Sequence, residues 1–192
     1  MEFEFAPLNV PEVVLVTPGR YRDERGFFQE SYRRSSFLEH GIDAHFVQDN
    51  LARSSKGVLR GLHYQIPPGA QGKLVGTVSG EIFDVAVDLR VGSPTYGRWV
   101  GSTLDADRGE LLWIPPGFAH GYVVLSESAD VYYKCTAEYR PELDRGVPPT
   151  RLGDVDHVGL ESRCEINLAD APPHSEHLFD RHDRLEVADR IG

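Results

Sequence analysis

The chain has 192 residues, which is long enough for one well-buried domain and short for two, so we predict a single domain over residues 1–192. Its formal net charge of −10 argues against a nucleic-acid-binding protein, because affinity for phosphate backbones comes from clustered cations. No apolar run is long enough to cross a membrane, which predicts a soluble protein. The chain has only two cysteines, too few for a disulfide scaffold, and its N-terminus alternates acidic and apolar residues, unlike a secretion signal. We therefore expect a cytoplasmic protein with reduced thiols.

The predicted elements are mostly strands. Short runs rich in Val, Ile, Phe and Tyr recur between Gly, Pro and Asp from residue 13 to residue 134, which is typical of an all-β sandwich or barrel. One short helix is predicted from Ser36 to His40, capped by Ser35 or Ser36 and ended by Gly41 in a left-handed conformation. From about residue 148 the strand pattern fades, so we expect this tail to wrap the barrel as loops.

Two strands carry polar residues in informative places. Residues 59–65 are predicted as a strand in which strict alternation separates Arg60 from His63, unless Gly61 marks a bulge that turns both to one face. In the strand predicted over residues 81–89, alternate residues are apolar on one face, while the other face carries Asp84 and Asp88.

The stretch around His63 suggests chemistry. Arg60 and His63 lie in one predicted strand, and Lys73 begins the next apolar run. Two cations beside a histidine suit an anionic substrate and a proton transfer. The residues alone leave open whether His63 is catalytic or a structural histidine with its hydrogen bonds satisfied.

A second histidine follows a tight turn, in the pattern Pro116-Gly117-Phe118-Ala119-His120. This pattern looks like the second conserved motif of cupin barrels. The first cupin motif of metal-binding members is incomplete here, since His63-Tyr64-Gln65 has no downstream glutamate at the expected distance. His63, His120 and Asp84 could still hold zinc or iron, although Lys73 would repel a metal nearby. The structural alternative for His120 is a hydrogen bond to Asp84 that fixes its tautomer.

The order of motifs between residues 20 and 146 resembles the dTDP-4-dehydrorhamnose 3,5-epimerase family of nucleotide-sugar epimerases. The resemblance implies a cupin-type double-stranded β-helix, also called a jelly-roll barrel, with one or a few short helices. The motifs are Asp23 to Phe28, Phe46 to Asn50, Lys56 to Gln65, Gly72 to Val75, Phe83 to Asp88, Ser93 to Gly97, Ile114 to Gly121, and Tyr133 to Thr136.

The same resemblance implies a reaction without a cofactor, in which the substrate's own 4-ketone is the electron sink. His63 matches the general base that removes a proton next to this ketone, and Lys73 matches the cation that stabilises the oxyanion. Tyr133 matches the proton donor on the opposite face of the sugar; its structural alternative is a core aromatic, a role for which the neighbouring Tyr132 is better suited.

Further residues match substrate contacts of the family. Arg25 and Arg60 match contacts to the diphosphate, and Tyr139 matches an aromatic side chain that stacks on the thymine. The remaining implied substrate contacts are Glu30, Gln48, Asp49, Asn50 and His120. Some family contacts cross a dimer, so a homodimer is implied, with a dTDP-4-keto-6-deoxyhexose as the substrate.

The tail departs from the family pattern. Gly146-Val147-Pro148-Pro149-Thr150 lacks the tryptophans expected near this region. Asp170 is the best match for the carboxylate that orients the catalytic histidine, with Ala169 where a lysine is expected. Asp144 is a weaker candidate. This divergence leaves open a mono-epimerase that inverts only carbon 3 or carbon 5, and two alternatives of other classes are a metal-dependent cupin and a non-catalytic sugar-nucleotide binder.

Overall fold

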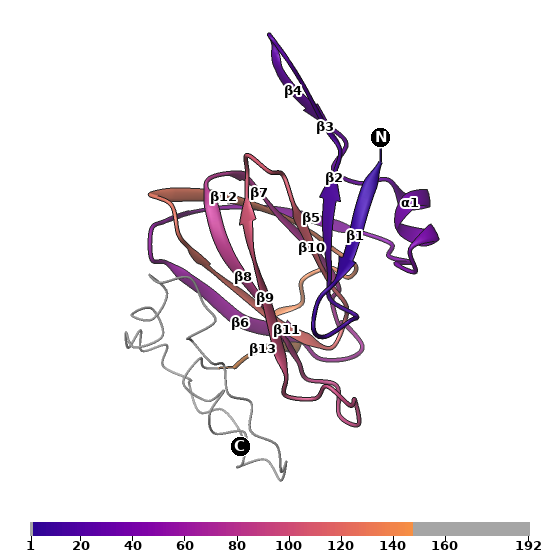
Figure 1. Ribbon diagram of the computed structural model, residues 1–192. Coiled ribbons are helices and arrows are strands. Elements are labelled where there is room, and N and C mark those ends of the chain that lie inside the picture. Colours follow the sequence, from indigo (N-terminus) through magenta and orange to yellow (C-terminus); the bar gives the residue numbers. More distant parts are fainter. Residues whose placement is uncertain (1, 148–192) are drawn as a thin grey trace.

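The computed structural model describes residues 2–147 of the chain. Within these residues the chain is an antiparallel β-structure with one α-helix (Figure 1). The elements follow in chain order as β1 (Phe3–Pro7), β2 (Val14–Pro18), β3 (Arg20–Asp23), β4 (Gly26–Gln29), α1 (Arg34–Glu39), β5 (Gln48–Ser55), β6 (Leu59–Gln65), β7 (Lys73–Ser79), β8 (Glu81–Asp88), β9 (Trp99–Asp105), β10 (Leu111–Ile114), β11 (Phe118–Val124), β12 (Ser128–Cys135), the 3-10 helix η1 (Pro141–Leu143) and β13 (Asp144–Gly146).

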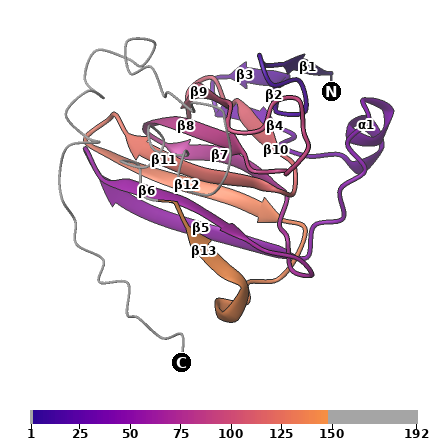
Figure 2. The same ribbon diagram turned by 90° about the horizontal axis from the view of Figure 1, so that it is seen from below.

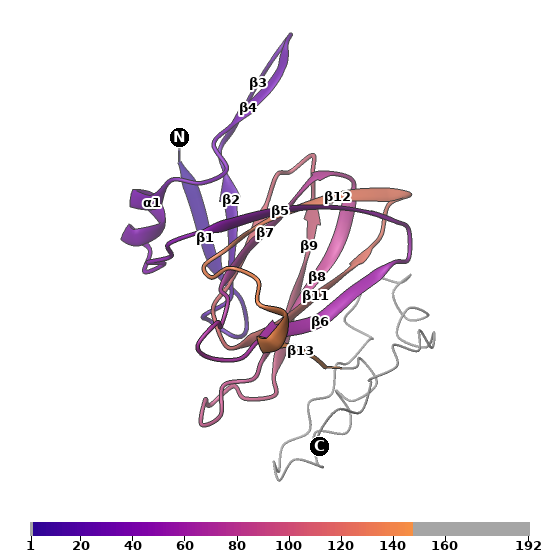
Figure 3. The same cartoon turned by 180° about the vertical axis from the view of Figure 1, so that it is seen from behind.

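Two sheets face each other and form a barrel (Figures 1 and 3). One sheet has six strands in the order β1-β2-β10-β7-β12-β5, and the other has five in the order β13-β6-β11-β8-β9. From β5 to β8 and again from β9 to β12 the chain alternates between the sheets, which is the connectivity of a jelly roll. The predicted all-β barrel is therefore confirmed for the described residues.

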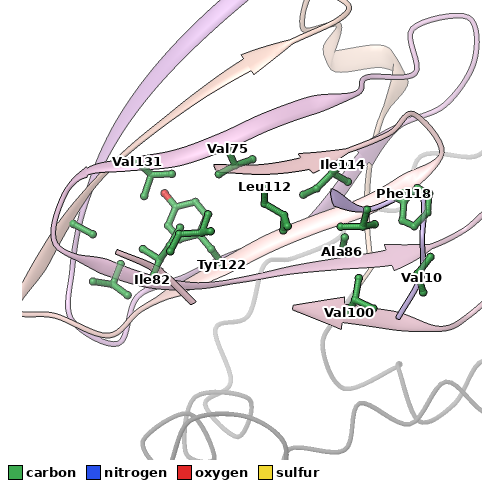
Figure 4. Close-up of a cluster of buried hydrophobic side chains, with 14 residues drawn as sticks. Val10, Val75, Ile82, Ala86, Val100, Leu112, Ile114, Phe118, Tyr122 and Val131 are labelled. Carbon is green, nitrogen blue, oxygen red and sulfur yellow. The ribbon is translucent and has the colours of Figure 1, made fainter. Parts of the chain in front are cut away.

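The main hydrophobic core lies between the two sheets (Figure 4). Val75, Leu112 and Val131 enter it from the six-stranded sheet, while Ile82 and Tyr122 enter from the five-stranded sheet. Burial of each such side chain contributes about 1.5–3 kcal/mol. This core fixes the two sheets against each other, and thereby fixes the polar side chains that share the barrel interior.

A second cluster covers the outer face of the six-stranded sheet. There α1 packs beside β1 and β2 (Figures 1 and 2), and its Phe37 is fully buried against Phe3 and Trp113 of the same cluster. A third cluster covers the outer face of the five-stranded sheet and includes Phe83 and Val85 of β8. Both sheets are thus covered by apolar side chains on two faces.

The helix differs from its prediction at one end. It begins at Arg34, so that Ser35 and Ser36 lie within it, and the N-cap residue Arg33 makes no side-chain capping bond. The predicted serine cap is therefore wrong, since Arg33 is instead bound to Glu30 in an ion pair. The predicted ending is confirmed, because Gly41 has φ +81° and its N–H and that of Ile42 bond the carbonyls of Leu38 and Phe37.

Strand β8 is confirmed, but both of its faces are buried. Phe83 and Val85 pack on the outside of the barrel, while Ile82 and Ala86 belong to the inner core. The face predicted to carry carboxylates therefore faces the interior, where Asp84 and Asp88 are completely inaccessible to solvent. Completely buried carboxylates require hydrogen-bonding partners.

The hairpin β3–β4 stands clear of the barrel (Figures 1 and 3). Its base is held by Arg20, whose guanidinium donates to the carbonyls of Ala106 and Asp107 at 2.8 and 2.6 Å. The hairpin exposes aromatic side chains, with Phe28 68% exposed. Within residues 2–147, no helix has the length and apolar character needed to span a membrane. The predicted course of the tail lies outside the described residues.

Candidate active site

A bulge in β6 brings Arg60 and His63 to one face. His63 pairs with His120 of β11 and Arg60 pairs with Tyr122, so three steps along β6 match two along β11. Gly61 has φ +123°, and a Cβ there would lie 2.5 Å from the Cα of Gly121. Only glycine fits at this point. The predicted bulge at Gly61 is confirmed, and both side chains belong to the inner face of the sheet.

A cavity of about 300 Å³ lies in the barrel between the two sheets. One wall comes from the six-stranded sheet, with residues of β5, β7 and β12, and the facing wall comes from β6 and β13 of the five-stranded sheet. The described residues that line it are Gln48, Asn50, His63, Gln71, Lys73, Tyr133, Cys135, Tyr139 and Asp144. Nearly all of them are polar, which makes this cavity the candidate active site.

His63 is mostly buried in the cavity wall. Burial is the largest cause, and together with the electrostatic effects of Lys73 and His120 it lowers the pKa of His63 to about 3. The imidazole is therefore neutral at pH 7, with a lone pair available to accept a proton. Its ring lies edge-on to that of His120, with centroids 6.0 Å apart.

Lys73 opposes His63 from the first residue of β7. It is only 3% exposed, and burial lowers the pKa of its ammonium group, while the charges of Cys135, Asp84 and Asp144 act to raise it. Because Lys73 lines the cavity, its amino group can stabilise negative charge that develops on a bound molecule.

Tyr133 lies on the same wall as Lys73, in β12. Burial raises the pKa of its phenol, with further raising by Cys135 and Tyr122, so the group retains its proton at neutral pH. Tyr132 points the other way and accepts a hydrogen bond from Lys134 at 3.1 Å. The two tyrosines point to opposite faces as predicted, but the expectation that Tyr132 is better suited to the core is wrong, because Tyr133 packs against the inner core while Tyr132 lies on the other face with Lys134.

His120 of β11 lies directly opposite His63 of β6 and is 2% exposed. Its Nε2 is 2.9 and 3.1 Å from the two carboxylate oxygens of Asp84, which confirms the hydrogen bond predicted between these residues. Its Nδ1 is buried and has no hydrogen-bond partner among residues 2–147. Those residues also contain no group of three or more His, Cys, Asp or Glu side chains placed to hold a metal ion.

Three further predicted residues meet at the cavity rim. Gln48 accepts a hydrogen bond from the backbone N–H of Tyr139 at 2.7 Å and donates one to Asn50 at 3.0 Å. Tyr139 is 52% exposed, so about half of its surface is open to solvent. This arrangement leaves an aromatic surface at the entrance of the cavity.

Other predicted residues lie outside the cavity. Asp49 lies on the opposite face of β5, where it binds Lys134 at 2.8 Å. Arg60 is exposed and donates to Ser54 at 2.8 Å, while its charge acts to lower the pKa of Tyr133. Arg25 lies at the tip of the β3–β4 hairpin in an ion pair with Asp23, and Glu30 follows β4. Asp170 lies outside the described residues.

The structure adds cavity residues that the sequence did not single out. Cys135 lies two residues after Tyr133 in β12 and so shares its strand face, and this alternation could have identified Cys135 from the sequence. Gln71 lies in the loop before β7 and donates to the carbonyl of Ala137 at 2.7 Å, for which no sequence signal exists. Asp144, a weaker candidate, lines the cavity and accepts a hydrogen bond from the Tyr139 hydroxyl at 3.4 Å.

Comparisons with known proteins agree with this site. A family model described as dTDP-4-dehydrorhamnose 3,5-epimerase matches residues 7–153. The dTDP-4-dehydrorhamnose 3,5-epimerase of Pseudomonas aeruginosa is 57% identical over 139 residues, which are 72% of this chain and 76% of that protein. The relative of the same name from Neisseria gonorrhoeae is 55% identical over 136 residues, 71% of this chain, but this match spans only 41% of its own length.

Among solved structures, a dTDP-6-deoxy-D-glucose-3,5-epimerase from Legionella pneumophila in complex with dTDP-4-keto-L-rhamnose superposes with a TM-score of 0.74. It is 50% identical, and the match covers 76% of this chain and 78% of that chain. The likeness confirms the cupin-type barrel. With the family model covering residues 7–153, the chain belongs to the dTDP-4-dehydrorhamnose 3,5-epimerase family of isomerases.

Proposed function

We propose that this chain epimerises a dTDP-4-keto-6-deoxyhexose at carbons 3 and 5 without a cofactor. The observation that carries the proposal is the position of His63 and Tyr133 on opposite walls of one cavity, with Lys73 on the same wall as Tyr133. A neutral base and a protonated phenol that face each other suit the removal of a proton from one face of a ring and its delivery to the other.

In this mechanism His63 takes the proton next to the 4-ketone. The electrons of the broken carbon–hydrogen bond move into the ketone, and the resulting enolate oxygen receives hydrogen bonds from the Lys73 ammonium group. Tyr133 then donates its proton to the opposite face of the same carbon, so that the stereocentre is inverted. Before each new cycle His63 releases its proton to solvent and the Tyr133 phenolate takes one up. Two such cycles, at carbons 3 and 5, then convert the substrate into the doubly inverted sugar.

The basicity of His63 requires a partner in this scheme. A histidine with a pKa of about 3 is a weak base at neutral pH, and a carboxylate beside its other ring nitrogen raises that pKa. We assign this role to Asp170, on the family resemblance. Asp170→Asn is expected to lower kcat at pH 7 about 100-fold, whereas Asp144→Asn, which removes a carboxylate that lines the cavity, is expected to retain the His63-dependent exchange.

The nucleotide is proposed to bind at the rim. Tyr139 is a half-exposed aromatic residue on which the thymine can stack, and Gln48 and Asn50 offer amide groups beside it. Arg60 is proposed to contact the diphosphate from the adjoining strand. A nucleotide contact by Asp49 is proposed only from the family resemblance, because in the structure Asp49 binds Lys134 on the outer face.

We propose that Arg25 and Glu30 act in the cavity of a second copy. Their hairpin extends away from its own barrel, and its exposed Tyr21, Phe27 and Phe28 provide apolar surface for a homodimer (Figure 1).

A mixing experiment tests this exchange between subunits. Arg25→Ala and His63→Ala variants are unfolded together and refolded, so that mixed dimers form. At substrate concentrations below KM, the mixture is expected to recover about a quarter of wild-type activity, because half of the dimers are mixed and each has one intact site. Activity no greater than the average of the two separate variants would contradict the exchange.

The proposed reaction needs no metal and no redox cofactor, because the substrate carries its own electron sink. The cytoplasm is the proposed location, and the free thiol of Cys135 fits a reducing compartment.

The direct test follows deuterium incorporation from heavy water into dTDP-4-keto-6-deoxyglucose by NMR, with protein purified in chelator. Exchange at carbons 3 and 5 with appearance of the inverted product is the expected result. Exchange at one carbon would identify a mono-epimerase. Binding without exchange would contradict the proposed activity, and activity that appears only with added metal would favour the metal-dependent alternative.

A further inference from the structure

Tyr139, on which the thymine is proposed to stack, lies in a segment without regular secondary structure. Residues 136–140 connect β12 to the 3-10 helix η1 and belong to no helix or strand. Glu138, Tyr139 and Arg140 are all exposed, so burial of their side chains does not fix this backbone. A stacking surface binds best if it is already in place, because ordering a loop on binding costs free energy. The position of Tyr139 therefore depends on the hydrogen bonds that hold its segment.

Gln65 holds the backbone on both sides of Tyr139. Its Oε1 accepts a hydrogen bond from the backbone N–H of Arg140 at 2.6 Å, and its Nε2 donates to the carbonyl of Glu138 at 3.2 Å. The same Nε2 donates to the carbonyl of Gly69 at 2.7 Å. Gln65 is only 3% exposed, so water competes little for these bonds. One buried amide thus bridges the residues before and after the aromatic side chain.

The position of Gln65 in β6 relates this amide to the cavity. Gln65 is the last residue of β6 and lies two residues after His63, so the two side chains share one strand face. The pairing with β13 is regular here, with Gln65 opposite Asp144 and His63 opposite Gly146. Gln65 is not among the described residues that line the cavity. It can therefore act on a bound nucleotide only through the segment that it holds.

Two other glutamines bond the same segment but differ from Gln65 in their exposure to a ligand. Gln71 donates to the carbonyl of Ala137 at 2.7 Å, and Gln48 accepts a hydrogen bond from the N–H of Tyr139 at 2.7 Å. Both line the cavity, so a bound nucleotide can compete for their amide groups. Gln65 is the anchor that lies away from this competition.

We propose that Gln65 is a positioning residue for nucleotide recognition, which holds residues 138 and 140 so that the Tyr139 ring is preorganised for the thymine. The inference rests on the proposed binding of the thymine at Tyr139. Without Gln65 the Glu138 carbonyl and the Arg140 N–H lose their buried partner, and the segment adopts other conformations. Nucleotide binding must then first restore the segment, which weakens affinity but leaves the proton transfers in the cavity unaffected.

The chain offers variants that separate this role from general destabilisation. Gln65→Met has a side chain of similar length but makes neither hydrogen bond. Ser126→Ala is the matched control, because Ser126 also bridges backbone groups: it accepts from the N–H of Glu81 at 2.9 Å and donates to the carbonyl of Ser128 at 2.7 Å. Ser126 precedes β12, whereas residues 136–140 follow it, so the control lies at the opposite end of the same strand.

The measurement is the binding of dTDP by titration calorimetry, with inorganic pyrophosphate as a ligand that lacks the base. We expect Gln65→Met to weaken dTDP binding about tenfold and to leave pyrophosphate binding unchanged, while Ser126→Ala changes neither. In turnover, Gln65→Met is expected to raise KM about tenfold with kcat within about twofold of wild type. Unchanged dTDP affinity in Gln65→Met, or an equal loss for dTDP and pyrophosphate, would overturn the proposal.

A double variant tests whether Gln65 acts through Tyr139. Tyr139→Ala is expected to weaken dTDP binding about 30-fold, and Gln65→Met added to it is expected to cause no further loss. A further tenfold loss, on the order of that in the single variant, would show that Gln65 acts by another route and would overturn the proposal.

Two more readouts keep the test decisive. Hydrogen–deuterium exchange of residues 136–140 without ligand is expected to be faster in Gln65→Met and unchanged in Ser126→Ala. If Gln65→Met does not fold, Gln65→Asn, whose shorter amide cannot reach both backbone partners, carries the same expectations. Because dTDP carries no reacting sugar, these outcomes are independent of whether the chain epimerises. Wild-type dTDP affinity in Tyr139→Ala would contradict the proposed thymine site and this inference together.

Discussion

Two polar clusters lie in the barrel and differ in how their charges are satisfied. In the first, here called the Asp88 network, Asp88 accepts hydrogen bonds from Arg90 at 2.8 and 2.9 Å, and from Ser93 and Thr95 at 2.6 Å each. Arg90 also binds Glu12 at 2.7 Å. Although burial acts to raise the pKa of Asp88, these hydrogen bonds outweigh it and hold that pKa well below its usual value.

The cavity shows the opposite arrangement. Burial shifts the pKa values of His63, Lys73 and Tyr133 toward their uncharged forms, and no ion pair with the described residues compensates His63 or Lys73. A polar cluster with satisfied hydrogen bonds stabilises a fold, whereas desolvated groups with shifted pKa values are typical of sites where chemistry occurs. The comparison therefore predicts that changes in the cavity affect activity and changes in the Asp88 network affect stability.

The largest expected effect is that of His63→Ala. This variant is expected to lose at least about 1,000-fold in kcat, because no other described group on its wall offers a neutral base to the substrate. Its melting temperature should stay within about 2 °C of wild type, since His63 makes no strong polar contact with residues 2–147. Activity is measured by proton exchange and stability by calorimetry; wild-type turnover in this variant would remove His63 from the mechanism.

Asp88→Asn tests the other cluster. Breaking a buried, hydrogen-bonded ion pair costs about 3 kcal/mol, while epimerase activity at 25 °C is expected to match wild type. Because the pKa of Asp88 is lower in the folded state, its contribution is fully present above about pH 4 and is lost as the pH falls below that value. Urea unfolding of both proteins at pH 7 and pH 3 checks this, and an equal difference at the two pH values would argue against the charge as the cause.

Tyr133→Phe separates the two halves of the reaction. The variant should still exchange substrate hydrogen through His63 but should complete inversion about 100-fold more slowly, because the opposite-face proton donor is missing. Comparing deuterium incorporation with product formation measures both. The matched control is Tyr132→Phe on the outer face of β12, which is expected to behave as wild type. Full epimerisation by Tyr133→Phe would mean that another group donates the proton.

Glu12→Gln should give the smallest effect. Glu12 is partly exposed, and its bond to Arg90 is an outer member of the Asp88 network. Removal of such an ion pair costs less than about 1 kcal/mol, and activity should not change. A loss as large as that of Asp88→Asn would show that Glu12, rather than Asp88, is the centre of the network.

The sequence predicted those features that depend on local pattern. Alternation predicted that Tyr132 and Tyr133 point to opposite faces but wrongly favoured Tyr132 for the core, and the glycine between Arg60 and His63 indicated the bulge that brings them together. The serine cap was wrong because burial of Phe37 and the Arg33–Glu30 pair determine where the helix begins.

Features that depend on tertiary contacts could not be predicted. Gln71 is in a loop that no local pattern places at the cavity. Asp144 was only a weaker candidate from the sequence, because it reaches the cavity through the pairing of β13 with β6. The sequence likewise placed Asp84 and Asp88 on one strand face, but only the structure separates the aspartate that binds His120 from the one in the Asp88 network.

The most direct test of this account is the titration of His63 by NMR, in wild type and in Asp170→Asn. The account predicts that His63 is neutral at pH 7 in both proteins, and that its pKa falls toward about 3 when the proposed partner carboxylate is removed. A His63 that is protonated at pH 7 in the wild-type protein would contradict the account, because a base that already holds its proton cannot remove one from the sugar.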